Sequence, residues 1–154
     1  MSDEYYSASA DTKLYIGTAT AIAGQTLPAD GSDSFTEVPL LGTITPPAKE
    51  QSAGSFYVLN DNNPRAVGGR AQEKNVPGNL VLDRSEVIHL NMSADADVAG
   101  GRKRNWRIVY PDGAIDKFKG FITQFNKTEL DASKEGEPHR VDFNIRVDGA
   151  VTEA

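Results

Sequence analysis

The stretch NWRIVYPDGAIDKFKGFITQF, residues 105–125, is the most regular part of this sequence. In its first half, the apolar side chains of Trp106, Ile108 and Tyr110 occupy every second position, which is the pattern of a half-buried β-strand. The sequence Pro-Asp-Gly follows at 111–113. Proline fixes φ and glycine tolerates positive φ, so a tight turn between two antiparallel strands is predicted. The hairpin contains no histidine, cysteine or serine, which indicates a framework element rather than a reaction site.

The return strand of this hairpin changes the phase of its apolar residues at Gly120. Phe118 and Ile122 are expected on one face, and Phe121 and Phe125 on the other. A glycine at such a change of phase is typical of a β-bulge. We therefore predict a bulge at Gly120.

The last strand of the chain alternates most clearly. Its apolar residues are expected to face a core and its polar residues to face water, as in an antiparallel sheet with one solvated side. The apolar set is Val141, Phe143, Ile145 and Val147, and the polar set is Asp142, Asn144, Arg146 and Asp148.

Other segments predict shorter elements. Short strands are expected around Lys13–Ile16, Phe35–Val38, Leu40–Ile44, Ser55–Leu59 and Asn79–Asp83. Residues 84–98 are ambiguous, because Val87, Leu90, Asn91 and Ala94 suit one face of a helix, whereas Ile88, Leu90 and Met92 suit one face of a strand. The spacing of Asp83 and Glu86 resembles a capping box and favours the helix, which Gly100 and Gly101 should end.

These elements predict a mainly β fold, a two-sheet β-sandwich or partly open barrel with one short flanking helix. The 154 residues suit one domain, at 12–150. An arm is expected at 1–11 and a tail at 151–154. A polar stretch at about 46–77 is rich in turn-forming residues and predicts a long loop, and loops of that length are usually functional or disordered.

Composition limits the class of protein. The sequence has no cysteine, so disulfides and thiolate metal sites are excluded. Net charge is −6; residues 1–50 carry two basic and seven acidic groups, and residues 101–154 carry ten basic and nine acidic groups. An acidic chain disfavours ordinary DNA binding, because phosphates repel it. The polar, acidic start and the absence of an apolar run of about 18 residues indicate folding in a cytosol, without a membrane partner.

Signals for catalysis, cofactors and metals are weak, so we expect no enzyme, no cofactor and no metal site. The two histidines, His89 and His139, have no local triad context and are expected to be structural. Asp95 and Asp97 lack the spacing of a calcium-binding loop.

Three further patterns contain residue types that can carry chemistry or bind a charged partner. Glu135 and Glu137 are expected in a solvated turn rather than as a glycosidase pair. Gly68-Gly69-Arg70 lacks the strand–loop–helix context of a phosphate-binding loop. The basic run Arg102, Lys103 and Arg104 is either a solvated strand entry or a set of salt bridges to the acidic Asp3 and Glu4 of a neighbouring subunit.

Several segments, in their order along the chain, resemble the major tail tube proteins of long-tailed, siphovirus-type bacteriophages. They are LYIG (14–17), FTEVPLLGTI (35–44), GNLVLD (78–83), WRIVYPDG (106–113) and FKGFITQF (118–125). The resemblance covers about residues 12–150. It implies a β-sandwich subunit with one flanking helix that forms hexameric rings, stacked into a tube through which genomic DNA leaves.

The resemblance also implies roles for particular segments. A loop within 46–77 would reach the adjacent ring, with Lys49, Glu50, Arg65, Arg70, Glu73 and Lys74 as candidate contacts, and the arm at 2–11 would help to join rings. Asp142, Asn144 and Arg146 are candidates to face the lumen. Partners would be further copies of the chain, tape measure and tail-terminator or tail-tip proteins, and double-stranded DNA in transit. The location would be the virion tail, assembled in the host cytoplasm.

A second class of function is a monomeric β-sandwich binding module, such as a carbohydrate-binding or receptor-binding domain of a virion. Trp106, Tyr57 and Tyr110 would then form an aromatic platform. In an alternating strand, however, a tryptophan belongs more often to the core.

Overall fold

The computed structural model describes residues 12–22, 24–49, 51–56, 59, 63–71, 73–128, 133 and 138–153. These residues form a mainly β structure with one α-helix and two sheets, as predicted. The elements are β1 (Lys13–Gly17), a 3-10 turn (Asp30–Ser32), β2 (Phe35–Glu37), β3 (Leu41–Ile44), β4 (Gln51–Phe56), β5 (Arg65–Ala71), β6 (Asn75–Val81), α1 (Val87–Ala96), β7 (Lys103–Val109), β8 (Ile115–Lys127), β9 (Arg140–Val147) and β10 (Thr152–Glu153). No helix among the described residues is long and apolar enough to cross a membrane.

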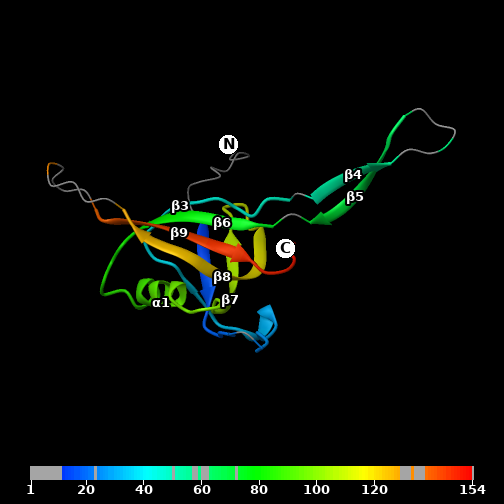
Figure 1. Ribbon diagram of the computed structural model, residues 1–154. Coiled ribbons are helices and arrows are strands. Elements are labelled where there is room, and N and C mark those ends of the chain that lie inside the picture. Colours follow the sequence, from blue (N-terminus) through cyan, green and yellow to red (C-terminus); the bar gives the residue numbers. More distant parts are fainter. Residues whose placement is uncertain are drawn as a thin grey trace, which may run out of the picture.

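The main sheet is antiparallel and has the order β2-β1-β7-β8-β9-β6-β3. Its two leaves share the long strand β8, which pairs with β7 through residues 115–121 and with β9 through residues 120–127. The leaf with β1 and β7 and the helix α1 both lie beneath the leaf formed by β3, β6, β9 and β8 (Figure 1). The layers therefore come from one bent sheet, and the second sheet, β4–β5, does not cover the core.

The core lies between the two leaves. Fully buried side chains come from β1, β7, β6, β9 and α1; the largest of them are Leu14, Ile16, Leu80, Met92, Trp106, Ile108, Phe143 and Ile145. Burial of each such side chain contributes about 1.5–3 kcal/mol relative to exposure. The prediction that Leu14 and Ile16 share a core face is confirmed, and so is the alternation of β9.

The turn between β7 and β8 has the predicted chemistry. Gly113 has a φ of 90°, a region that L side chains rarely adopt. The amide of Gly113 donates to the carbonyl of Tyr110 at 3.0 Å, and the amide of Ala114 donates to Oδ1 of Asp112 at 3.0 Å. The sequence Pro-Asp-Gly therefore closes the hairpin through local hydrogen bonds.

The predicted bulge at Gly120 is wrong. Gly120 pairs regularly with Arg104, and the register shift falls between Ile122 and Gln124, so that Thr123 is the extra residue. This extra residue returns Phe125 to the core side, where it packs against the buried cluster instead of facing away from it. Gly120 is required for close packing, because a Cβ atom there would lie 2.5 Å from the carbonyl oxygen of Arg146.

The predicted helix is confirmed as α1, but its cap and its buried face differ from the prediction. Asp83 does not cap it; its Oδ1 accepts hydrogen bonds from the amide and hydroxyl of Ser85. The buried positions are His89, Met92 and Asp95, whereas the exposed fractions of Val87 and Leu90 are 62% and 52%. Polar His89 and Asp95 can be buried because each has hydrogen-bond partners inside the fold.

His89 fastens α1 to the sheet. Its Nδ1 accepts a hydrogen bond from the amide of Asp83 at 3.1 Å, so its Nε2 carries the proton and donates to the carbonyl of Pro39 at 2.8 Å. Both ring nitrogens are therefore engaged. This histidine is a structural residue, as predicted.

The expected long loop at about 46–77 is replaced by two strands and the start of a third. β4 and β5 pair from Gln51↔Ala71 to Phe56↔Arg65 and form a hairpin that extends away from the body (Figure 1). The single strand predicted at Ser55–Leu59 is therefore placed too late. The segment was predicted as a loop because it is polar and rich in glycine. A two-stranded hairpin that projects from the body has no core to pack against, so its strands lack the apolar alternation that identifies a strand in the sequence.

The last residues also differ from the expected tail. Thr152 pairs with Lys117 and Glu153 with Asp116, so that β10 covers the first part of β8. Val151 packs against the core cluster. The end of the described chain is thus part of the sheet.

Candidate functional site

The outer face of β9 and its neighbours is polar and solvent-facing. The three residues predicted to face a lumen, Asp142, Asn144 and Arg146, all lie on this side of β9, between the buried side chains of the same strand. Sheet register places Asn79 opposite Asp142 and Asn75 opposite Arg146, on the adjacent strand β6. We call this surface the polar face; its further members are Thr43, Thr45, Pro77, Gln124 and Asn126.

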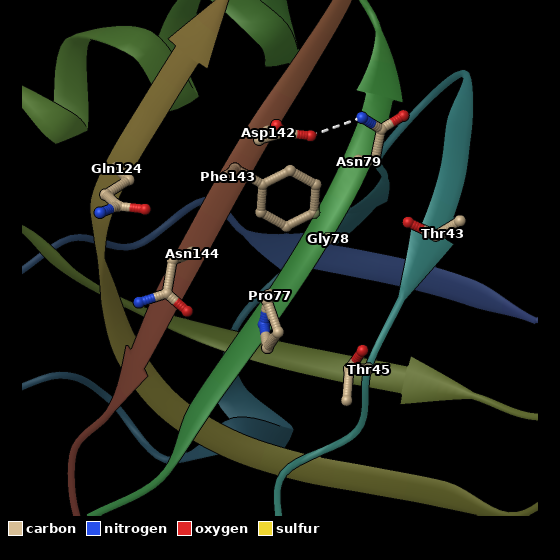
Figure 2. A pocket seen from close by; sticks show the side chains of 9 residues that line it. All are labelled: Thr43, Thr45, Pro77, Gly78, Asn79, Gln124, Asp142, Phe143 and Asn144. Carbon is tan, nitrogen blue, oxygen red and sulfur yellow. Dashed lines mark hydrogen bonds between the residues drawn. The ribbon is translucent and has the colours of Figure 1, made fainter. Parts of the chain in front are cut away.

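Side-chain hydrogen bonds run across the strands of the polar face. Asn79 Nδ2 donates to Asp142 Oδ1 at 2.6 Å (Figure 2). Asn144 Nδ2 donates to Thr123 Oγ1 at 2.9 Å and to Asn75 Oδ1 at 3.2 Å. These lateral bonds occupy donors and acceptors that would otherwise be offered to a passing molecule.

The polar face has balanced charge. Arg146 forms an ion pair with Glu73 at 2.7 Å, and Arg140 lies near Asp142 through their shared partner Asn79. Two cations and two anions therefore cancel. A surface without excess cations releases few counterions from a polyanion and gains little binding free energy from it.

A shallow hollow of about 320 Å³ crosses the polar face between β3, β6, β9 and β8. Figure 2 shows Thr43, Asn79 and Gln124 around it, each from a different strand. Its floor is at Gly78, where a Cβ atom would lie 2.5 Å from the ring of Phe143. The hollow is open and polar, so it resembles a smooth surface more than a ligand pocket.

The four strands beneath the polar face have two unpaired edges within the described part of the chain. β3 is the last strand of the sheet order, and residues 122–127 of β8 pair only with β9. Leu41–Ile44 contains no charged residue or proline, and residues 122–127 contain one charged residue, Lys127, at the end of the strand. Natural edge strands usually carry such residues to prevent association, so these two edges are suited to pairing with another chain.

Three of the six residues predicted for contacts between rings, Lys49, Glu73 and Lys74, lie next to the ends of the β4–β5 hairpin that join the body. Lys49 forms an ion pair with Glu153, and Glu73 pairs with Arg146. Lys74 is adjacent, and its carbonyl accepts from the amide of Val147. Arg65 is on the hairpin itself. Glu50 and the side chain of Arg70 lie outside the described residues, and so do Asp3, Glu4 and the arm at 1–11.

The basic run 102–104 has ion-pair partners within its own chain, whereas its predicted contact with Asp3 and Glu4 of a neighbouring subunit stays a prediction, because both acidic residues lie outside the described residues. Arg104 is buried, and its Nε donates to Asp95 Oδ2 at 2.5 Å. Arg102 reaches the other oxygen of Asp95 at 3.0 Å, and Lys103 pairs with Asp148 at 2.9 Å. Arg102 and Arg104 both pair with Asp95, because a buried carboxylate needs a cationic partner.

The aromatic platform of the alternative binding module is not formed. Trp106 is fully buried, and its Nε1 donates to the carbonyl of Gly120 at 3.1 Å. Tyr110 is half-buried and donates its hydroxyl hydrogen to Asp116. Tyr57 lies outside the described residues. Burial of Trp106 in the core removes the central member of the platform.

Among the residues that the structure describes, no group of three or more His, Cys, Asp or Glu side chains is arranged to hold a metal ion. Asp95, whose spacing with Asp97 already argued against a calcium loop, forms ion pairs with Arg102 and Arg104. Glu135 and Glu137 fall outside the described residues.

Sequence reasoning found the polar positions of β9 but missed those of β6. Pro77 and Gly78 indicated a loop, so the strand was placed at Asn79–Asp83 although it starts at Asn75. Alternation within NVPGNL, with Asn75, Pro77 and Asn79 on one side, was the available signal.

Comparison with solved structures finds this fold in phage-like tail particles. A chain from the sheath/tube terminator of an extracellular contractile injection system (PVC) in the extended state matches with a TM-score of 0.74 and 11% identity, covering 99% of each chain. A chain from the tube-terminating cap of the anti-feeding prophage (AFP) matches with a TM-score of 0.64 and 12% identity, covering 91% of this chain and 87% of that chain.

A chain from the tail of an empty gene transfer agent (GTA) particle, with C6 symmetry, matches with a TM-score of 0.58 and 14% identity, covering 92% of this chain and 95% of that chain. No protein-family model and no curated protein sequence matches this chain. At such low identity the likeness establishes the fold alone. The chain therefore has the tail-tube-like β fold that occurs in contractile injection systems and gene transfer agent tails.

Proposed function

We propose that this protein is a structural subunit of a tail tube, in which rings of identical chains stack into a hollow cylinder with the polar face toward the channel. The observation that carries the proposal is the leaf β3-β6-β9-β8, which has a charge-balanced polar face and, among the described residues, two unpaired edges whose only charged residue is Lys127 at the end of β8. Similar chains occur in tube and tail assemblies, which supports a structural role without catalysis.

The direction of the strands permits closure into a ring. Successive strands in this leaf are antiparallel, so β3 and β8 run in opposite directions. If β8 of one copy pairs with β3 of the next, the antiparallel ladder continues without interruption. An even number of strands per copy is what this continuation requires. A closed barrel then leaves no edge exposed.

The size of such a ring suits a DNA duplex. Six copies would contribute about 24 strands, which at about 4.8 Å spacing and about 40° tilt give a backbone diameter of about 48 Å. Six-fold symmetry is supported by the GTA tail and by a similar chain from the six-fold symmetrised AFP baseplate (TM-score 0.67, 7% identity). Side chains would narrow the channel by about 10 Å, leaving room for a duplex.

The chemistry of the polar face suits transit rather than capture. Asp142, Asn144 and Arg146 would face the channel, and the two ion-pairable arginines of this face are balanced by carboxylates. Passing DNA would therefore meet hydrogen-bonded amides and little net charge. Weak, uniform contact lets a polyanion slide, whereas a cationic lining would hold it through counterion release.

The β4–β5 hairpin is proposed to join one ring to the next. Two-stranded hairpins are at best marginally stable alone in water, and this one exposes Phe56 and Val67. Arg65 on the hairpin, and Lys49, Glu50, Arg70, Glu73 and Lys74 near its foot or second strand, are the proposed polar contacts. The arm at 2–11, including Asp3 and Glu4, would contribute a second joint.

The proposed partners are other copies of this chain, a tape measure protein inside the tube, and terminator or tail-tip proteins at its ends. Its place would be the tail of a phage-like virion, assembled in the host cytoplasm, with double-stranded DNA passing through. Because similar chains come from both contractile systems and GTA tails, a siphovirus-type tail is the finer part of this proposal.

Electron microscopy of the concentrated protein tests the proposal directly, and rings or hollow tubes are expected. Disulfide trapping adds a molecular test, because the chain has no native cysteine. Thr43→Cys and Gln124→Cys lie on the same face but are separated by β6 and β9, about 14 Å apart. A disulfide needs Cα atoms within about 7 Å, so any bond must join two copies.

When rings assemble, a mixture of the Thr43→Cys and Gln124→Cys proteins should form mixed disulfide dimers. Asn126→Cys, on the same face of β8, is an alternative to Gln124→Cys in this mixture. The matched control is Thr36→Cys, an exposed position on β2 at the far end of the sheet, which should not link to β8. Protein that stays monomeric at every concentration and forms no mixed dimers would contradict the proposal.

A further inference from the structure

An apolar groove of about 520 Å³ lies where the bent sheet fails to close into a barrel. It runs between the edge strand β3 and the far ends of β1 and β7. Leu41, Ile44 and Pro46 line one side, and Tyr110 and Thr12 line the other. We call it the seam groove.

The seam groove has an uncharged lining. The hydroxyl of Tyr110 donates to Asp116 Oδ2 at 2.5 Å, so the ring faces the groove with its polar atom already satisfied. Burial and this hydrogen bond both raise the pKa of Tyr110, which keeps the phenol neutral. An apolar groove of this kind gains free energy when an apolar side chain displaces its water.

The position of the groove indicates what covers it. It lies on the core side of β3, directly beside the edge that no described residue pairs with. A strand added to that edge would point every second side chain toward the groove and the intervening ones toward the polar face. The occupant is therefore an apolar residue on the core side of an added strand.

Phe125 is the matching residue at the opposite edge of the same leaf. The bulge at Thr123 turns Phe125 to the core side of β8, between Gln124 and Asn126 on the polar face. It remains half-buried although it belongs to the apolar cluster. Across the leaf, Phe125, Phe143, Gly78 and Ile44 are successive partners in the ladder, so Phe125 and Ile44 lie on the core side of its two opposite edges. A closed barrel staggers neighbouring copies along the strand direction, so the contact considered is with the groove as a whole, from Leu41 to Pro46.

We propose that the seam groove is the socket for Phe125 of a second copy of this chain. The inference rests on the proposed ring assembly and names the contact that selects the neighbour. Edge pairing through backbone hydrogen bonds is tolerant of sequence, whereas an aromatic side chain in an apolar socket fixes which residues lie side by side. The bulge at Thr123 thus acts as a register device, because without it Phe125 would face the channel.

Mixed disulfides test the contact. Phe125→Cys protein is mixed with Ile44→Cys or Leu41→Cys protein, both at positions that line the groove, or with Thr45→Cys protein, at a position that lines only the hollow of the polar face. A groove-side partner is expected to link at several times the yield of the Thr45→Cys partner. Equal yields, or a higher yield with Thr45→Cys, would overturn the proposal.

Assembly measurements supply the second test. Phe125→Ala should raise the protein concentration needed for ring formation by about tenfold or more. Phe121→Ala changes a residue of the same strand that lies outside the unpaired edge. When the two variants are compared at the same fraction of folded protein, Phe121→Ala should change the concentration needed for ring formation much less. If Phe125→Ala assembles like the wild type, the socket is wrong but the ring is not. If the wild-type chain forms no rings, the proposed function and the socket both fail.

The competing occupant is the arm of the same chain. Tyr5→Cys or Tyr6→Cys combined with Ile44→Cys in one chain would then give an intramolecular disulfide in the monomer. That result, together with ring formation that Phe125→Ala leaves unchanged, would assign the groove to the arm and overturn the proposal.

Discussion

The Nδ2 atom of Asn79 donates a hydrogen bond to Oδ1 of Asp142 at 2.6 Å, across strands β6 and β9. The two residues are 63 positions apart in the sequence and directly opposite in the sheet. This pair gives the carboxylate a fixed partner on a surface where Arg140 also reaches Asn79. Charge balance on the polar face is thus a property of the folded sheet.

A variant with excess positive charge on the polar face should bind DNA, whereas the charge-balanced polar face of the wild type should not. The double variant Asp142→Lys, Asn144→Lys adds about three positive charges to the polar face of each copy. We expect assembled protein to bind duplex DNA at low salt, with affinity falling steeply as salt rises. The measurement is a salt series of binding titrations with a fluorescent duplex.

The matched control for that experiment is Glu37→Lys with Thr36→Lys, which adds the same charge on β2, at the other end of the sheet. The control variant should bind DNA only on the outside of the tube. Tubes that retain DNA inside the channel should therefore form only with the Asp142→Lys, Asn144→Lys variant. Equal retention of DNA by both variants after washing would show that the polar face does not line a channel.

Removal of the β4–β5 hairpin should separate ring formation from stacking. Gln51 and Ala71 are paired, so residues 52–70 can be replaced by Asn-Gly, which closes a two-residue turn. The core is untouched, and we expect a folded chain that forms rings but no tubes. Deletion of residues 2–11 should have the same direction of effect. Circular dichroism and electron microscopy give the two readouts, and tubes of normal length after both deletions would contradict the role.

Asp95→Asn should destabilise the monomer strongly. Asp95 and Arg104 are both buried, and the substitution leaves the Arg104 guanidinium without its anionic partner. Removal of one member of a buried pair costs about 3–5 kcal/mol. Arg102→Ala removes the more exposed partner and should cost much less. Urea unfolding measures both, and similar losses for the two variants would contradict this account.

Gly120→Ala should lower stability because there is no room for a methyl group. The added Cβ atom would lie 2.5 Å from the carbonyl oxygen of Arg146, which is held in the β8–β9 ladder. Overpacking of this kind costs about 1–3 kcal/mol. Gly31→Ala is the control, since nothing lies within 4 Å of its Cβ position. Thermal unfolding compares the two, and equal midpoints would contradict the packing argument.

Asp33 should make stability depend on pH. Partial burial pushes the pKa of Asp33 upward, but hydrogen bonds from Asn105, Ala19, Ser34 and Thr18 outweigh it and hold the pKa below the ordinary value of 3.8. A lowered pKa in the folded state means that the carboxylate stabilises the fold above the unfolded-state pKa. This stabilisation is lost as pH falls through the lower, folded-state pKa.

Asp33→Asn should therefore be less stable than the wild type at pH 7, and the difference should shrink as pH falls below about 4. Denaturant unfolding from pH 7 to pH 3 measures it. Asp97→Asn, at an exposed position after α1, serves as the control and should show little difference. A gap between wild type and Asp33→Asn that stays constant to pH 3 would rule out the linkage.

The sequence by itself determined the elements whose chemistry is local. Alternation in Val141–Val147 identified β9 and its polar positions, and Pro-Asp-Gly at 111–113 determined the turn between β7 and β8. Both signals depend only on residues within a few positions of each other. The same is true of the existence of α1 and of the mainly β class.

The tertiary structure alone decided which residues meet across long separations. The buried side of α1 follows His89 and Asp95 because Pro39 and Arg104 supply their partners, and no helical periodicity contains that information. The bulge at Thr123 likewise reflects pairing with β9, since only a partner strand can set a register. Periodicity records local geometry, whereas burial of a polar group or a change of register depends on contacts that the chain makes only after it folds.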